Sequence, residues 1–170
     1  MSVADEILDT LRSEFSDVAD AAQITRIVVR LSIAALLGGI LGFERESQGK
    51  AAGIRTHMLV ALGSALFVLV PQQAGMSIVD MSRVIQGIVT GVGFLGAGAI
   101  IKHASEQNVQ GLTTAAGVWM TSAIGIACGL GRDTTAILST LLALAILRLI
   151  PHFVGRRSDA PPPVDRKDDR

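Results

Sequence analysis

The stretch GIVTGVGFLGAGAII, residues 87–101, decides how this chain can fold. Three of its glycines have the G-x-G-x-x-G spacing that opens many dinucleotide-binding sites. Such a site needs a strand before it, a helix after it and an acidic residue about 20 positions later to hold the ribose. No acid stands at that distance, because the next acids are Glu106 and Asp133. The flanks stay apolar for a full membrane thickness, so we interpret the stretch as a membrane span.

Other long runs without charge surround it. The 170 residues are 49% hydrophobic and have a mean hydropathy of +0.50, too apolar for an ordinary soluble domain of this length. A bilayer core of about 30 Å needs about 20 helical residues. We therefore predict an all-α membrane protein, a bundle of five transmembrane helices packed through glycines. The predicted spans are residues 24–43, 56–73, 84–101, 112–130 and 134–150.

The second span is the weakest, because only the 13 residues 58–70 form its uncharged centre. The basic residues favour it nonetheless. With five spans, ten of them fall on one side and four on the other, which places the C-terminus in the cytoplasm and the N-terminus outside. The ten are Arg45, Lys50, Arg55, Lys102, Arg148, Arg156, Arg157, Arg166, Lys167 and Arg170, and the four are Arg12, Arg26, Arg83 and Arg132.

The two ends differ from this membrane domain, residues 24–150. Apolar residues at helical spacing (Ile7, Leu11, Phe15 and Val18) predict an acidic amphipathic segment over residues 1–23, and the start lacks the pattern of a cleavable signal peptide. The DAAQ sequence that starts at Asp20 is expected to cap the first span. Residues 151–170 are rich in proline and charge, which predicts a disordered cytoplasmic tail.

Glycine is the residue most expected to pack these helices. The chain has 18 glycines, five phenylalanines and no tyrosine, which predicts thin helices in close contact. Helices in lipid associate largely through small residues four positions apart, because such residues let two backbones approach. We expect this role for Gly38, Gly42, Gly87, Gly91, Gly125 and Gly129. Gly93, Gly96 and Gly98 go around their helix, so they either pack or permit a bend.

Polar side chains beside the spans are the candidate functional residues. Glu44 and Arg45 directly follow the first span, which predicts ion pairs with neighbouring helix ends at one membrane rim. Asp80 is expected to cap the third span, with Arg83 as its i+3 partner. The full candidate set is Glu44, Arg45, Lys50, Arg55, Thr56, Asp80, Arg83, Gln86, Thr113 and Thr114.

Little in the chain favours metal or catalytic chemistry. Glu44 and Asp80 are weak Mg²⁺ candidates, because carboxylate oxygens suit that ion, but the predicted topology puts them about 30 Å apart. No acid lies inside a predicted span, which disfavours a cation pathway. His57 and His103 lack the partners of a metal hydrolase, and we expect no enzyme activity. Cys128 is expected to be buried and inert. We expect neither a cofactor nor nucleic acid.

Three blocks together identify a family resemblance. GGILGFERESQGKAAGIRTHMLVALGSALF (38–67), SRVIQGIVTGVGFLGAGAII (82–101) and VQGLTTAAGVWMTSAIGIACGLG (109–131) resemble the membrane domain of the MgtC/SapB family of bacterial inner-membrane proteins. The resemblance runs from about Arg30 to Leu149 in one order. The candidate set above matches the polar motif positions of that family.

The resemblance implies a multi-pass protein of growth under magnesium limitation and, in pathogens, of virulence. Founding members are thought not to carry the ion, and the virulence proteins are understood to restrain ATP synthase through membrane contacts. We therefore expect the lipid bilayer and either a membrane protein, such as the ATP synthase membrane sector, or a second copy as partners. The alternative is a small magnesium or cation transporter or channel subunit. Only a short charged tail follows Pro151, so this is expected to be a short form lacking the soluble C-terminal domain.

Overall fold

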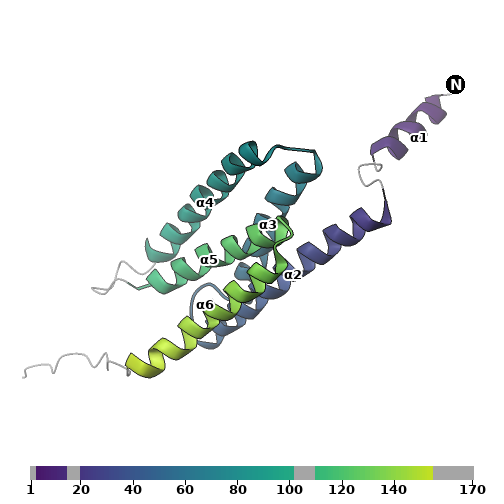
Figure 1. The fold of residues 1–170 in the computed structure, drawn as a ribbon. Coiled ribbons are helices and arrows are strands. Elements are labelled where there is room, and N and C mark those ends of the chain that lie inside the picture. Colours follow the sequence, from purple (N-terminus) through teal and green to yellow (C-terminus); the bar gives the residue numbers. More distant parts are fainter. Residues whose placement is uncertain (1–2, 15–19, 102–109, 155–170) are drawn as a thin grey trace, which may run out of the picture.

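The computed structural model describes residues 3–14, 20–101 and 110–154, and the regular elements of these segments are all helices (Figure 1). In chain order they are α1 (Val3–Glu14), α2 (Ala21–Ser47), α3 (Ile54–Gln73), α4 (Ile78–Ile101), α5 (Leu112–Gly129) and α6 (Asp133–Val154). Five of them, α2 to α6, are long and apolar enough to cross a membrane. This confirms the predicted all-α membrane fold, and it gives the dinucleotide-like glycines of α4 a helical setting.

All the spanning helices except α5 extend beyond the apolar runs that predicted them. α2 begins at the predicted cap, since Asp20 accepts a hydrogen bond of 2.7 Å from the amide of Gln23. It continues past residue 43 to Ser47, because a helix ends where the backbone can turn rather than where charge begins. That turn comes at Gly49, whose φ of 67° favours glycine, and whose amide donates to the Glu46 carbonyl.

The ends of the chain fit the predicted segments only in part. α1 forms within the acidic N-terminal segment, while Phe15 and Val18 lie outside the described residues. Residues 151–154, which we assigned to the tail, continue α6. The remainder of the tail, residues 155–170, also lies outside the described part of the chain.

α5 is the central helix of the bundle. It packs against α2, α3, α4 and α6, whereas α4 contacts only α3 and α5, and α6 only α2 and α5. Successive spans run in opposite directions, so the bundle has two ends (Figure 1). The α2–α3 end holds the loop of residues 48–53 and the start of α5, and the α3–α4 end holds residues 74–77 and the α5–α6 turn.

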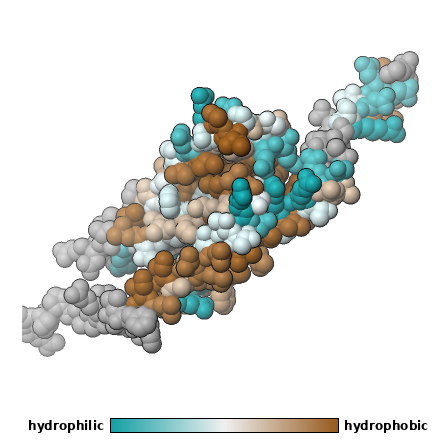
Figure 2. Space-filling model, viewed as in Figure 1, coloured by the Kyte–Doolittle hydropathy of each residue, from teal (hydrophilic) through white to brown (hydrophobic). Residues whose placement is uncertain are grey.

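Two apolar clusters hold the bundle together. One joins α2, α3, α5 and α6 around Leu41, Ala61 and Ile124, and it contains the fully buried Cys128. The other joins α3, α4 and α5 around Val68. Outside these clusters, large apolar side chains of α4 and α6 are exposed, and hydrophobic surface covers much of the visible face of the bundle (Figure 2).

The glycines of α2 and α5 bring these helices against α3. A Cβ at Gly38 would lie 2.6 Å from the His57 carbonyl oxygen, and one at Gly42 would lie 2.6 Å from the Ile54 Cα. On α5, Gly125 faces the backbone of Ala61, and Gly129 repeats the contact one turn further along α3. Any side chain at these positions would force the helices apart, so each glycine sets a helix spacing.

The glycines of α4 have a different setting. A Cβ at Gly96 would lie 3.5 Å from the Ala115 Cβ of α5, which is ordinary contact. At the other four glycines of this helix no described atom lies within 4 Å of the Cβ position; they are Gly87, Gly91, Gly93 and Gly98. α4 is nevertheless a continuous helix from Ile78 to Ile101. These glycines therefore face open space on its outer surface.

Candidate functional site: a buried polar cluster at the α2–α3 end

Glu44 and Arg45 lie inside the helix bundle, in the last turn of α2. Their exposed fractions are only 1% and 3%. Arg45 Nε donates a hydrogen bond of 2.5 Å to Glu44 Oε2. Glu44 Oε1 is also buried and has no hydrogen-bond partner among the described residues. Glu44 follows the predicted span of residues 24–43, but it still lies within α2, because the helix continues beyond its apolar run.

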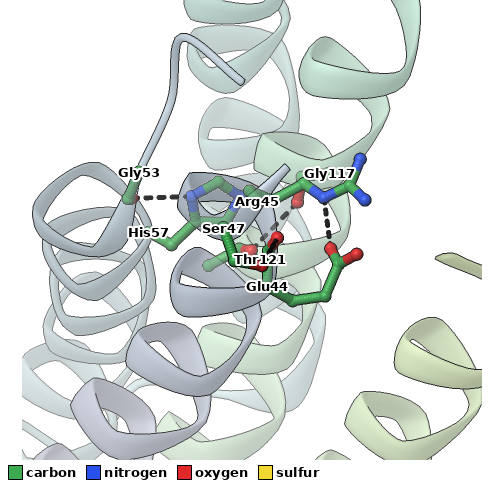
Figure 3. Close-up of polar contacts among 7 residues, drawn as sticks. All are labelled: Glu44, Arg45, Ser47, Gly53, His57, Gly117 and Thr121. Carbon is green, nitrogen blue, oxygen red and sulfur yellow. Dashed lines mark hydrogen bonds and ion pairs between the residues drawn. The ribbon is translucent and has the colours of Figure 1, made fainter. Parts of the chain in front are cut away.

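His57 completes the cluster from the second turn of α3. It is fully buried, and its Nδ1 donates to the Gly53 carbonyl oxygen at 3.0 Å, while Nε2 has no partner in the described part of the chain. Gly117 of α5 lies beside both side chains, since a Cβ there would be in ordinary contact, 3.5 Å from His57 Nε2 and 3.8 Å from Arg45 Cδ. Figure 3 shows the Arg45 side chain extending towards Gly117 beside His57.

Sequence reasoning undervalued His57. We considered it only as one of two rim histidines, and the other, His103, lies outside the described residues. A usable signal was its register with Gly53 four residues earlier, which lets the imidazole bond to the carbonyl of the preceding turn. The signal is local, whereas the burial of the ring comes from Gly38 and Gly42 of another helix.

Buried hydroxyl groups surround the cluster and are largely satisfied by nearby oxygens. Ser64 and Ser122 share a hydrogen bond of 2.8 Å between α3 and α5. Thr121 donates to the Gly117 carbonyl at 2.9 Å. Thr114 is buried in the first turn of α5, whereas its neighbour Thr113 is exposed. Such groups hold helices together in lipid and do not by themselves form a reactive site.

The other candidates of the α2–α3 end do not join the buried cluster. Lys50, Arg55 and Thr56 are exposed. The expected ion pairs between helix ends do not form among the described residues, since Glu44 pairs with its own neighbour Arg45. The link between α2 and α3 comes instead from Glu46, whose carboxylate accepts a hydrogen bond of 2.9 Å from the amide of Ile54.

Asp80, Arg83 and Gln86 are exposed and lie towards the α3–α4 end. That end is opposite to the α2–α3 end, which holds Glu44 (Figure 1). The expectation that Asp80 caps α4 is wrong, because the cap lies three residues earlier. The capping residue is Ser77, whose hydroxyl accepts from the Asp80 amide at 3.1 Å and donates to the Asp80 carboxylate at 2.7 Å. α4 starts at Ile78, so Asp80 is its third residue, and it forms no ion pair with Arg83.

Arg30 is held by protein groups at the same end. Its Nη1 donates to Gln72 Oε1 at 2.8 Å and to the Gly129 carbonyl at 3.0 Å. Gly131, at a φ of 72°, leaves space for the guanidinium against the α5–α6 turn. This side chain therefore joins α2, α3 and the end of α5.

The chemistry of these sites is limited. The described residues contain no group of three or more His, Cys, Asp and Glu side chains placed to hold a metal ion. Glu44 is accompanied by the Arg45 cation, which opposes the binding of Mg²⁺ at that carboxylate. The buried cluster can therefore hold a charge network within the bundle and present the other nitrogens of Arg45 to a ligand.

Comparisons with known proteins find one family and several similar chains. Residues 31–156 match the model of the MgtC family. The protein named "Putative magnesium transporter YhiD" of Escherichia coli K12 is 41% identical over 136 residues, which cover 76% of this chain and 62% of that protein.

Two further relatives have similar identity. Protein SrpB of Synechococcus elongatus is 43% identical over 129 residues, 69% of this chain and 71% of SrpB. Protein MgtC of Brucella abortus is 43% identical over 125 residues, 73% of this chain and 51% of that protein. This chain thus spans less than two thirds of YhiD and about half of the Brucella protein. No solved structure matches.

Proposed function

This chain belongs to the MgtC family, and from that membership we propose that it is a non-enzymatic inner-membrane protein that supports adaptation to low magnesium by contacting another membrane protein. The family and the five apolar helices support a multi-pass membrane protein of the MgtC type. Arg45, Lys50, Arg55 and Arg148 support a cytoplasmic position for the α2–α3 end, because basic residues are retained on that side. The same topology puts the N-terminus outside.

The observation that carries the contact proposal is a groove between α3 and α4. Its volume is about 540 Å³, and its lining includes Gly63, Gly87 and Gly91. All three lack any described atom within 4 Å of the Cβ position, unlike the glycines that join α2 and α5 to α3. Leu59 and Leu95 give the groove apolar, exposed walls. A groove with glycine on both helices admits a further helix at close backbone distance, which is the main source of packing energy in lipid.

A partner helix from a different protein fits this groove in a way that leaves the bundle intact. α4 contacts only α3 and α5, so its outer face is available without displacing a span. We expect the partner to be a membrane complex such as the membrane sector of ATP synthase. Association of two copies of this chain through the same groove is the competing outcome.

Two leucine substitutions on α4 test the contact. Gly91→Leu fills the groove, whereas Gly93→Leu places the same side chain two residues away, where it does not line the groove. We expect wild type and Gly93→Leu to co-purify with the ATP synthase membrane sector, and Gly91→Leu to lose most of it. If both variants, or neither, co-purify with the ATP synthase membrane sector, the groove is not the contact surface.

The alternative, a small magnesium or cation transporter or channel subunit, is favoured by one observation. Glu44 places a carboxylate oxygen without a described partner inside the helix bundle, and buried acids of membrane proteins are often functional. The contact proposal predicts that liposomes holding only the purified protein take up Mg²⁺ no faster than empty ones. Mg²⁺ uptake by liposomes holding the wild-type protein, above the rate of empty liposomes, would establish the transporter instead.

A further inference from the structure

A chamber separate from the α3–α4 groove opens at the α2–α3 end. It has a volume of about 450 Å³, within the range of about 300–1,000 Å³ usual for small-molecule pockets. Most of its lining is aliphatic, with Leu41 from α2, Met120 from α5 and Leu142 and Ile146 from α6. Because α6 contacts only α2 and α5, the chamber borders the lipid-facing side of the bundle. Its interior therefore suits a hydrocarbon chain.

A basic recess adjoins this chamber. The recess, of about 670 Å³, shares Arg45 and Thr113 with the chamber and adds Lys50 and Arg148. Lys50 and Arg148 are exposed and form no ion pair within the described segments. The apolar chamber and the basic recess thus meet at Arg45.

Charge at this junction favours an anion. Arg45 uses Nε for Glu44, and its two Nη nitrogens donate no hydrogen bond to any described residue. Glu44 and Glu46 flank Arg45 in the chain; Glu44 is paired with Arg45, and Glu46 accepts a hydrogen bond from the Ile54 amide. Neither carboxylate lines the chamber or the recess, whereas three cations do, so an added phosphate would meet a net positive field.

We propose that the chamber and the recess together bind one acidic phospholipid. The phosphate lies among Arg45, Lys50 and Arg148, and an acyl chain lies along the chamber between α5 and α6. Basic pockets between transmembrane helices bind anionic headgroups in this way, and burial of each CH₂ adds favourable free energy. A free phosphate would use the recess alone and leave the aliphatic chamber unused, so the lipid accounts for both features.

The charge requirement is tested by native mass spectrometry of the full-length protein with phosphatidylglycerol or phosphatidylcholine. We expect preferential retention of phosphatidylglycerol. The double variant Lys50→Gln/Arg148→Gln should weaken that binding about 25-fold, at about fivefold for each basic residue. The matched control Arg55→Gln/Arg83→Gln removes the same charge from residues that do not line the recess, and it should bind as wild type. Equal retention of both lipids, or equal loss in both variants, would overturn the proposal.

The chain requirement needs a separate variant. Ser139→Phe narrows the chamber from α6 without altering its charge, and Ala145→Phe puts the same ring on α6 outside the lining. We expect Ser139→Phe alone to lose phosphatidylglycerol; Ala116→Leu repeats the test from α5 if Ser139→Phe lowers helix content. Glycerol phosphate, a headgroup without chains, should not compete. Competition by glycerol phosphate with full binding by Ser139→Phe and Ala116→Leu would show a free-anion site and contradict the lipid.

Discussion

Gly42 shows how one missing side chain sets a helix contact. The α3 backbone occupies the space where its Cβ would be, with the Ile54 Cα 2.6 Å away. Gly63, on the opposite helix of this pair, has open space at the same position. Both residues lack a side chain, but only Gly42 allows a close contact between α2 and α3.

We predict that Gly42→Ala destabilises the bundle by about 1–3 kcal/mol, because overpacking forces α2 and α3 apart. Gly63→Ala should change stability by less, since its methyl group meets no described atom. Thermal unfolding in detergent, followed by circular dichroism, measures both. Equal midpoints for the two variants would contradict the assigned contact.

The pair of Glu44 and Arg45 leads to a second prediction. Breaking a buried ion pair leaves an unpaired buried charge and costs about 3–5 kcal/mol, while replacing both members can be nearly neutral. Glu44→Gln should therefore destabilise the protein strongly, and Glu44→Gln/Arg45→Met should recover most of the loss. Arg12→Gln is the control, because its pair with Asp9 is exposed. Similar unfolding midpoints for the single and double variants would show that the charges are not coupled.

Burial of this pair was beyond what the sequence could predict. Charged residues after an apolar run normally mark the membrane rim, and that rule placed Glu44 and Arg45 in a loop. The structure extends α2 through them and covers them with α3 and α5, and the approach of α3 depends on Gly42. The rule is local, but burial is decided by helices 10 to 70 residues away in the chain.

At the scale of elements, the existence and order of the five spans follow from the apolar runs, while their ends do not. Asp20 was predictable as a cap because its side chain acts on the next turn. Ser77 was not singled out, since Asp80 offered the more obvious acid three residues later. The position of a helix end depends on which of the nearby polar side chains accepts the hydrogen bond from the free backbone amide.

Arg30 provides a prediction about how elements are joined. It connects α2 to Gln72 in the last turn of α3 and to the Gly129 carbonyl at the end of α5. Arg30→Met keeps an apolar stem and removes these hydrogen bonds, which are worth about 1.5–3 kcal/mol when one partner is charged. We expect faster amide exchange in the α5–α6 turn, measured by hydrogen–deuterium exchange. Arg26→Met, an exposed change one turn earlier on α2, should leave that exchange unchanged.

At the scale of the whole molecule, some glycines pack helices against each other inside the bundle, and others face its outer surface. Glycines of α2 and α5 close the contacts with α3, and the glycines of α4 other than Gly96 stay open on the outer face. The sequence pattern assigned Gly87 and Gly91 the same packing role as the glycine pairs of α2 and α5, because spacing alone does not reveal which side of a helix meets a neighbour. Only the packing of the complete bundle distinguishes them.

Topology is a prediction of the same scale. A reporter fused after Arg170 should behave as cytoplasmic, and one inserted at Gln72 should behave as external. The reason is the excess of basic residues at the α2–α3 end. Alkaline phosphatase and fluorescent protein fusions at the two positions give opposite signals if this holds. The same signal at both positions would contradict this topology, because it would require an even number of spans between Gln72 and Arg170.

The central claim is that the α3–α4 groove binds a helix of another membrane protein. Photo-crosslinking in living cells at low magnesium tests it most directly, with a photoreactive residue at Leu95 in the groove or at Leu141 on the exposed side of α6. The account predicts an adduct to a different membrane protein from position 95 and none from position 141. Adducts of equal yield from both positions, or an adduct from position 95 only to a second copy of this chain, would contradict it.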